Sequence, residues 1–159
     1  MVRVLAADAL WAVVAGVPDP ELPQVTIGDL GMVRDVRVGA LGVDVDITPT
    51  YTACPATEAI CADIVAALAA ADVRDARVHV TLAPAWSSDD ITPVGRAKLA
   101  AAGIAPPGAA TPGAVELPPA CPRCGSRRTR LVSWFGATAC KSAHRCLACA
   151  EPFEAFKAI

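Results

Sequence analysis

The chain carries Cys121-Pro122-Arg123-Cys124 in its C-terminal quarter, followed after 21 further residues by Cys146-Leu147-Ala148-Cys149. Two such pairs are typical of a zinc ribbon, in which two tight turns bring four thiolates around one tetrahedral metal ion. The separation is slightly longer than usual and predicts a long hairpin between the turns. A segment this short buries too little apolar surface to fold alone, so a metal would supply most of its folding free energy. We therefore predict that these four cysteines bind a structural zinc ion.

The composition limits the class of protein. The chain has 159 residues, enough for one domain and a small appendage. No apolar run is long enough to cross a bilayer, and the N-terminus lacks the apolar stretch of a signal peptide. These features predict a cytoplasmic protein that does not enter the membrane. In a reducing compartment, paired cysteines bind metal more often than they form disulfides.

The charge is divided unevenly along the chain. Residues 1–103 hold seven basic and thirteen acidic residues, whereas residues 104–159 hold seven and three. The basic ribbon could meet nucleic acid, an acidic partner protein, or the acidic part of a second copy in a homodimer. A solvated basic face without a partner carries about equal weight.

Residues 1–103 are predicted to form one α+β domain. A helical repeat runs from Leu5 to Val14, and alternating apolar residues over 36–38 and 43–47 indicate two strands of a hairpin. A helix over about 56–71 and a strand over 78–82 follow. Four residues are expected on the inner face of that helix: Ile60, Ile64, Val65 and Leu68.

A last helix should begin after Thr92, with Pro93 at its first position, and end at Gly103. The order α-β-β-α-β-α then predicts a small mixed sheet with helices on one face. Residues 104–120 contain five prolines and two glycines and are predicted to form a linker. Residues 121–159 would form the zinc ribbon, a small β module.

Cys54 is the main candidate for reactivity outside the ribbon. It precedes Pro55 at the expected start of a helix, where the helix dipole and unpaired N–H groups favour a thiolate. A thiolate there suits a soft metal ion or nucleophilic attack. A buried structural cysteine is the alternative. That alternative is favoured for Cys61, which lies seven residues later in the same apolar helix.

Two other features are weaker candidates. Asp19 and Glu21 lie in a proline-rich loop, where carboxylates can do acid–base chemistry, bind a hard metal or form the turn itself. Cys140 lies between the two cysteine pairs beside Lys141, so it is either a second reactive thiol or a packed cysteine. The sequence contains no phosphate-binding loop, dinucleotide-binding motif or recognisable catalytic triad, and conventional catalysis therefore has little support.

The first domain resembles a known family. Its motifs Asp19-Pro20-Glu21, Asp29-Leu30-Gly31, Thr48-Pro49-Thr50 and Cys54-Pro55 are similar to those of the SufT-like domain of iron–sulfur assembly proteins. The resemblance implies that Cys54 is the reactive cysteine and handles iron or a cluster transiently. It also makes four neighbours candidate cofactor-binding residues: Asp19, Glu21, Asp29 and Thr50.

The tail narrows this resemblance. The stretches Cys121–Ser126, Ser133–Lys141 and Cys146–Phe153 resemble the PaaD family of phenylacetate-degradation proteins, also called PaaJ. That family joins a SufT-like domain to such a ribbon, so the resemblance covers nearly the whole chain. It implies an accessory component of the multicomponent phenylacetyl-CoA 1,2-epoxidase of bacterial aromatic catabolism.

The resemblance also implies partners and leaves alternatives. The oxygenase of that system carries a di-iron centre, and its reductase carries an iron–sulfur cluster and a flavin. We expect the chain to assemble or repair one of these centres, with Cys54 handling metal and the basic ribbon docking the client. A non-catalytic structural subunit of the oxygenase complex is the alternative. A nucleic-acid-binding ribbon is least favoured, because the first domain is acidic and stacking aromatics are few. Whether the chain is itself a catalyst stays open, with a non-catalytic role favoured.

Overall fold

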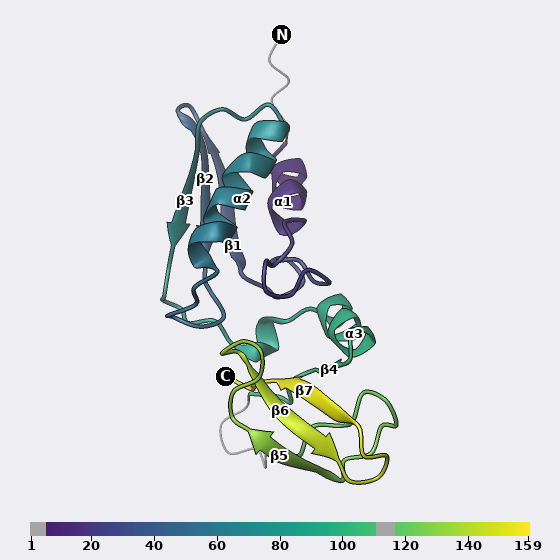
Figure 1. Cartoon of the computed structure of the whole chain (residues 1–159). Coiled ribbons are helices and arrows are strands. Elements are labelled where there is room, and N and C mark those ends of the chain that lie inside the picture. Colours follow the sequence, from purple (N-terminus) through teal and green to yellow (C-terminus); the bar gives the residue numbers. More distant parts are fainter. Residues whose placement is uncertain (1–5, 111–116) are drawn as a thin grey trace. The chain divides into compact units, whose positions relative to one another are not determined.

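A computed structural model gives the fold and describes residues 6–110 and 117–159 (Figure 1). The chain divides into two compact units, Met1–Trp86 and Ser87–Ile159. Within the described ranges, no helix combines the length and apolarity needed to cross a membrane. Leu5, where the first predicted helix begins, and residues 111–116 of the predicted linker lie outside the described residues.

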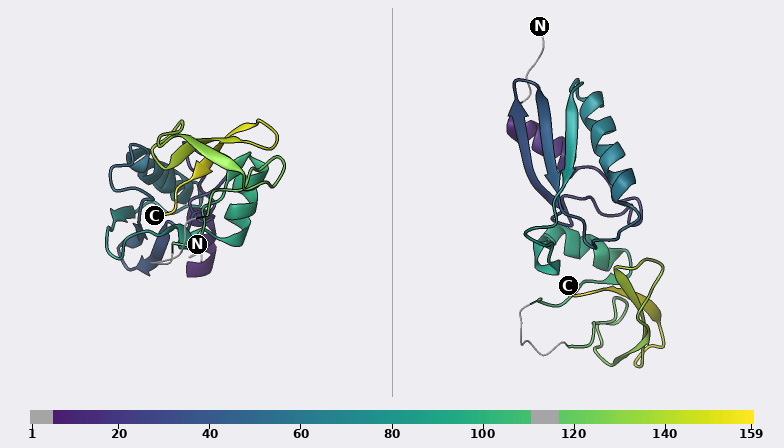
Figure 2. Two further views of the ribbon diagram at one scale, coloured as in Figure 1. Left: turned by 90° about the horizontal axis from the view of Figure 1, so that it is seen from below. Right: turned by 90° about the vertical axis from the view of Figure 1, so that its left-hand side faces the viewer.

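The first unit contains two helices and a three-stranded sheet. Its elements in chain order are α1 (Ala7–Ala15), β1 (Val33–Gly39), β2 (Gly42–Ile47), α2 (Thr57–Ala70) and β3 (Ala76–Val80). The strands lie in the order β1-β2-β3, with β1 and β2 antiparallel and β2 and β3 parallel. Both helices lie on the same side of the sheet (Figure 1), and the right-hand view of Figure 2 shows the three strands side by side. The predicted α+β class and mixed sheet are confirmed.

The core of the first unit follows from two apolar periodicities. On β2, Val43, Val45 and Ile47 are buried, and the intervening aspartates face the other way, as strand alternation requires. On α2, Ile60, Ile64 and Leu68 recur every four residues and are fully buried. The prediction for Val65 was wrong: its side chain is 41% exposed, because it lies about 100° around the helix from Ile64.

A long loop between α1 and β1 is tied to this core. The Ile27 N–H donates to the Val17 carbonyl at 2.9 Å, and Trp86 Nε1 donates to the Leu30 carbonyl at 2.7 Å. Gly28 approaches α1 so closely that a β-carbon there would come within 2.6 Å of the Ala15 carbonyl oxygen. The loop is therefore a packed part of the unit, held by backbone hydrogen bonds.

The second unit holds a short 3-10 segment, an α-helix and a four-stranded sheet. Its elements are η1 (Ser88–Asp90), α3 (Pro93–Ala101), β4 (Ile104–Ala105), β5 (Thr129–Ser133), β6 (Lys141–Cys146) and β7 (Pro152–Phe156). The strand order is β4-β7-β6-β5, with β4 parallel to β7 and the other pairs antiparallel. Strand β5 therefore forms one edge of the sheet.

The end signals of α3 act as predicted. Thr92 Oγ1 accepts a hydrogen bond from the Gly95 N–H at 3.0 Å, Pro93 is the first helical residue, and Gly103 adopts a positive φ of 78°. However, the division between the units lies earlier than the predicted boundary near Gly103. Helix α3 packs against β4, and β4 occupies the first two residues of the segment predicted as linker. Those two residues pair with β7 and so join the sheet of the ribbon.

Candidate functional site

Four cysteine sulfurs converge in the second unit. The Sγ atoms of Cys121, Cys124, Cys146 and Cys149 all lie within 4.8 Å of one another. The Cys121 and Cys149 sulfurs are 3.7 Å apart, and the Cys124 and Cys146 sulfurs are 3.6 Å apart. A tetrahedral zinc ion with Zn–S bonds of about 2.3 Å requires sulfurs separated by about 3.8 Å. The four thiols therefore fit a metal ion of this kind.

Two equivalent turns place these sulfurs. In the first, the Gly125 N–H donates to the Cys121 carbonyl at 2.8 Å, and Gly125 has a φ of +74°. In the second, Ala150 takes the matching position after Cys149, with a φ of +64°. Glycine adopts this left-handed conformation without steric strain, whereas alanine does so at a cost.

Two of the cysteines also form part of the interior of the ribbon. Cys121 and Cys146 are 1% exposed and cluster with Ala105, Phe153 and Ala155. At Cys146, the backbone N–H of Cys149 is the largest influence and, together with that of Ala148, lowers the pKa of the thiol to about 7 despite burial. N–H groups aimed at sulfur favour the thiolate that a metal ion needs as ligand.

Cys54 lies in the first unit, three residues before α2. Its carbonyl accepts hydrogen bonds from the Thr57 hydroxyl at 2.9 Å and the Thr57 N–H at 3.2 Å, which starts the helix. Its side chain is half-buried. Cys54 lies beside the start of the helix, as predicted, but the pKa of its thiol is not lowered.

The pKa of the Cys54 thiol is raised above its ordinary value. Burial is the main cause, the Ala56 N–H acts in the opposite direction, and the carboxylates of Glu21 and Asp19 raise the pKa further. The helix start favours the thiolate through the Ala56 N–H, as expected, but this effect does not dominate. Desolvation and two nearby acids outweigh the hydrogen bond. The carboxylates of the acidic loop therefore lie close enough to Cys54 to affect the pKa of its thiol.

The other residues proposed around Cys54 form turns. Asp19 is buried, and its Oδ1 accepts the N–H groups of Glu21 at 2.8 Å and Leu22 at 3.0 Å. Burial raises the pKa of Asp19 against the effect of these two bonds. Asp29 Oδ2 accepts the Thr26 N–H at 2.9 Å, and Thr26 Oγ1 accepts the Asp29 N–H at 3.0 Å.

These contacts favour the turn-forming interpretation of the two aspartates. Thr50 is also buried. The binding roles of Asp19, Glu21, Asp29 and Thr50 stay predictions.

Cys140 is buried, and its Sγ lies 3.1 Å from Thr138 Oγ1. Lys141 was expected to favour a thiolate at Cys140, but its ammonium binds Glu154 Oε2 at 2.6 Å. These contacts favour the packed interpretation of Cys140 over the reactive one.

Sequence reasoning missed Glu154. Its carboxylate receives both the buried Lys141 ammonium and the N–H of Ala137, and so ties the loop between β5 and β6 to β7. The only signal was an acidic residue in an otherwise apolar strand.

Two family models match the chain in succession. Residues 7–80 match the iron–sulfur cluster assembly protein family, and residues 105–157 match the PaaD zinc beta ribbon domain. A relative from Escherichia coli (strain K12) is named as one of the subunits of a "Putative 1,2-phenylacetyl-CoA epoxidase". It is 45% identical over 152 residues, which cover 94% of this chain and 92% of the relative.

Solved structures resemble the first part of the chain. The crystal structure of domain of unknown function DUF59 from Bacillus anthracis is 29% identical, with a TM-score of 0.54, and the match covers 58% of this chain and 90% of that one. The solution structure of Rv1466 from Mycobacterium tuberculosis is 32% identical, with a TM-score of 0.35, over 65% of this chain and 94% of that one. With a near full-length relative and both domain matches in the expected order, the chain belongs to the PaaD family of phenylacetate-degradation proteins, in which an iron–sulfur assembly domain precedes a zinc ribbon.

Proposed function

We propose that the chain is an accessory factor of a phenylacetyl-CoA epoxidase, and that it helps to assemble or repair the iron or iron–sulfur centre of that enzyme. The observation that carries this proposal is the 45% identity, over nearly the full length, to a protein named as a subunit of such an epoxidase. The match of residues 7–80 to an iron–sulfur cluster assembly family supplies the chemistry. The oxygenase and reductase components would be its partners, in the cytoplasm.

Cys54 would be the residue that takes iron or a cluster from a donor and passes it to the client. Its thiol is half-buried, and burial together with Glu21 and Asp19 raises its pKa, which favours the protonated form. Binding of a metal would therefore release a proton, and return of that proton would favour release of the cargo. A transient carrier needs such reversible binding, and a single thiol provides it more readily than a closed set of four.

The ribbon would hold zinc permanently. Four thiols with sulfur separations close to those of a tetrahedral site support zinc or another thiophilic metal. A set of four leaves no ligand position open for chemistry, so the metal would be structural. Metal analysis of anaerobically purified protein should find one zinc per chain, which Cys54→Ala leaves unchanged.

Complementation tests the proposal. A strain that lacks this protein would receive the wild type, Cys54→Ala or the matched control Cys61→Ala, which removes a half-buried thiol from α2. We expect Cys54→Ala to leave the iron content of purified oxygenase or reductase near that of the deletion strain, and Cys61→Ala to restore it. Full iron content and full epoxidase activity with Cys54→Ala would refute a maturation role for this thiol.

A structural subunit of the oxygenase complex is the second candidate. It is supported by the word subunit in the name of the Escherichia coli relative. It predicts stoichiometric co-purification with the oxygenase and normal client iron in the Cys54→Ala strain. A transient, substoichiometric association would instead favour the maturation factor.

A further inference from the structure

Two arginines oppose each other directly on the exposed sheet of the ribbon. Arg130 of β5 pairs in register with Arg145 of β6. Like charges in such a cross-strand pair destabilise a sheet. The arrangement becomes favourable when an anion lies between or above the two guanidinium groups, because each presents a fork of N–H donors that matches a carboxylate.

Three of the other basic groups of the ribbon are already engaged. Arg123 forms an ion pair with Glu151, Arg127 donates to the Pro118 carbonyl at 3.0 Å, and Lys141 is buried against Glu154. Over residues 6–110 and 117–159, no carboxylate is recorded within ion-pair distance of Arg130 or Arg145.

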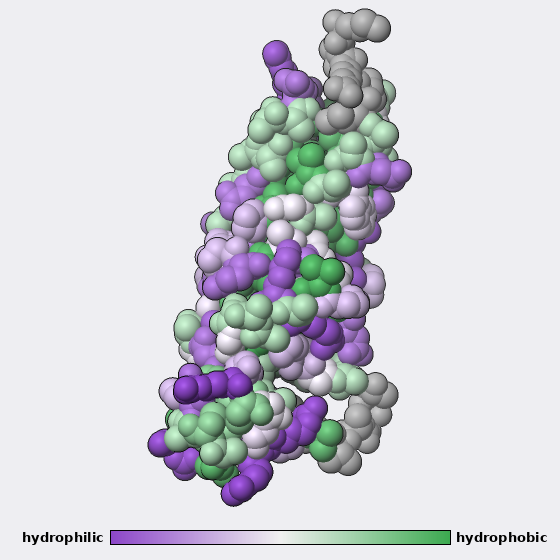
Figure 3. Space-filling view, turned by 90° about the vertical axis from the view of Figure 1, so that its right-hand side faces the viewer, coloured by the Kyte–Doolittle hydropathy of each residue, from purple (hydrophilic) through white to green (hydrophobic). Residues whose placement is uncertain are grey.

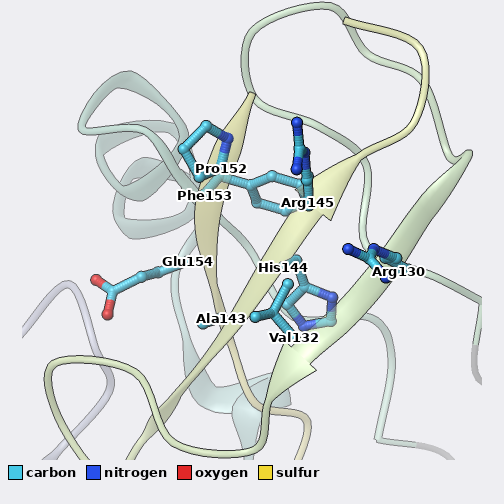
Figure 4. Close-up of a pocket in the computed structure, with 8 residues that line it drawn as sticks. All are labelled: Arg130, Val132, Ala143, His144, Arg145, Pro152, Phe153 and Glu154. Carbon is cyan, nitrogen blue, oxygen red and sulfur yellow. The ribbon is translucent and has the colours of Figure 1, made fainter. Parts of the chain in front are cut away.

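A hollow lies beside these two arginines. It has a volume of about 420 Å³, and its lining is Arg130, Val132, Ala143, His144, Arg145, Pro152, Phe153 and Glu154. Glu154 points away from both arginines in Figure 4, toward its bond with Lys141, and so does not neutralise them. His144 stacks on Phe153 with ring centroids 5.6 Å apart, and among the described residues its buried Nδ1 has no hydrogen-bond partner. Most residues that line the hollow are thus apolar, and its two cations are Arg130 and Arg145.

The strand beside the hollow is exposed and carries apolar side chains. Strand β5 is an edge of the sheet, Val132 on it is 61% exposed, and Trp134 and Phe135 directly after it are 66% and 70% exposed. Hydrophobic and hydrophilic residues also alternate over the face of this unit drawn in the lower part of Figure 3. Tryptophan, phenylalanine and arginine are enriched in the buried centres of protein interfaces. An open sheet edge accepts an extended segment as an added strand.

From these observations we propose that β5 and the arginine pair form a docking site for an extended acidic segment of a partner protein. A carboxylate of the segment would bind Arg130 and Arg145 together, and an apolar side chain two residues away would enter the hollow against Val132. The site therefore fits a peptide in which an acidic and an apolar residue stand two positions apart, because alternate side chains of a strand face the same side.

In the docking step of the proposed function, this surface would bind an acidic segment of the partner. Only the identity of that partner rests on the proposed function. The docking site involves neither Cys54 nor client iron. Failure of complementation would therefore refute the proposed function, whereas failure of the peptide to bind would refute only the docking site.

Binding by the full chain, loaded with zinc, tests the site. The probe is a fluorescein-labelled ten-residue peptide in which aspartate and valine take turns at every second position, with serine between them. It is compared by fluorescence anisotropy with the same peptide carrying asparagine in place of aspartate. We expect the acidic peptide to bind at least tenfold more tightly, and Arg130→Gln or Arg145→Gln to weaken it about tenfold each. The matched control Arg128→Gln removes an exposed charge of the same ribbon outside the hollow and should change Kd less than about twofold. Hydrogen exchange of residues 129–133 should slow on binding.

Several outcomes would overturn the site. Equal or undetectable binding of the two peptides would show that the site does not recognise the carboxylates. An effect of Arg128→Gln equal to that of Arg130→Gln would show that only net charge attracts the peptide. Tighter binding of a labelled ten-nucleotide single-stranded DNA, with log affinity falling linearly with log salt, would make this a nucleic-acid surface. A dimer in sedimentation that Arg145→Gln dissociates would assign the surface to a second copy of the chain. Circular dichroism and zinc content would show that each variant is folded.

Discussion

The two units of this chain bury different kinds of interior. The first unit encloses aliphatic side chains from a sheet and two helices, such as Val45, Ile60 and Leu68, which are fully buried. The small interior of the ribbon includes Cys121 and Cys146, clustered with two alanines and a phenylalanine. Burial of apolar surface stabilises the first unit, whereas we expect the ribbon to depend on bonds from sulfur to a metal. We therefore expect the first unit to offer a chemically available thiol and the ribbon to use its thiols for structure.

Removal of the metal should give the largest difference in stability between the two units. Chelation under anaerobic, reducing conditions, or Cys146→Ser, should unfold the ribbon, because a structural zinc ion contributes about 10 kcal/mol to a small domain. NMR amide signals of residues 121–156 should collapse to unfolded positions, and those of β1, β2 and α2 should persist. Loss of dispersion in both units, or in neither, would contradict the proposed difference. Cys61→Ser is the control.

The reverse experiment acts on the first unit. Leu68→Ala removes a fully buried side chain and should lower the free energy of unfolding of that unit by about 3 kcal/mol. Zinc content and ribbon signals should not change. Val65→Ala on the same helix is the matched control, and its exposed side chain predicts less than about 1 kcal/mol. Equal effects would mean that α2 does not present Leu68 to the core.

Glu154→Gln tests whether an ion pair supports the metal-dependent unit. The Lys141 side chain is 6% exposed, so loss of the charge opposite it should destabilise the ribbon by about 2 kcal/mol, less than a fully buried pair because Glu154 is partly exposed. Urea unfolding followed by ribbon amide signals measures the loss. Glu151→Gln breaks the exposed pair with Arg123 and should cost less than about 1 kcal/mol.

The two turns that hold the metal offer a smaller, paired test. Gly125→Ala should cost about 1 kcal/mol, and Ala150→Gly should gain about 1 kcal/mol, because both positions have positive φ. Competition with a chelator, measured as the apparent zinc dissociation constant, should shift in opposite directions. A shift in the same direction for both would show that factors other than φ control these positions.

The smallest expected effect lies on the exposed face of the first sheet. Arg77, and then His79, hold the pKa of Asp44 well below its usual 3.8. The stabilisation is therefore fully present above pH 3.8 and is lost as the pH falls through the lower, folded-state pKa. The urea midpoint of the wild type minus that of Asp44→Asn should shrink as the pH falls below about pH 4. A difference that grows as the pH falls below about 4 would contradict the assignment.

Local patterns predicted most of the elements. Alternation at Val43, Val45 and Ile47 identified β2, and Thr92 with Pro93 identified the start of α3, because strand alternation and helix capping depend on neighbours in the chain. The exposure of Val65 and the raised pKa of Cys54 could not be predicted in this way. Both depend on what packs around the residue, and at Cys54 that includes carboxylates more than 30 positions earlier.

The sequence by itself determined the two-part design. Spacing alone identified the four cysteines as a metal set, and apolar periodicity identified the α+β unit that precedes them. Only the tertiary structure decided that β4 joins the ribbon, that Glu154 neutralises Lys141, and that Arg130 pairs with Arg145 at the edge of the sheet. Such pairings depend on strand register and order, which bring together residues that no local pattern connects.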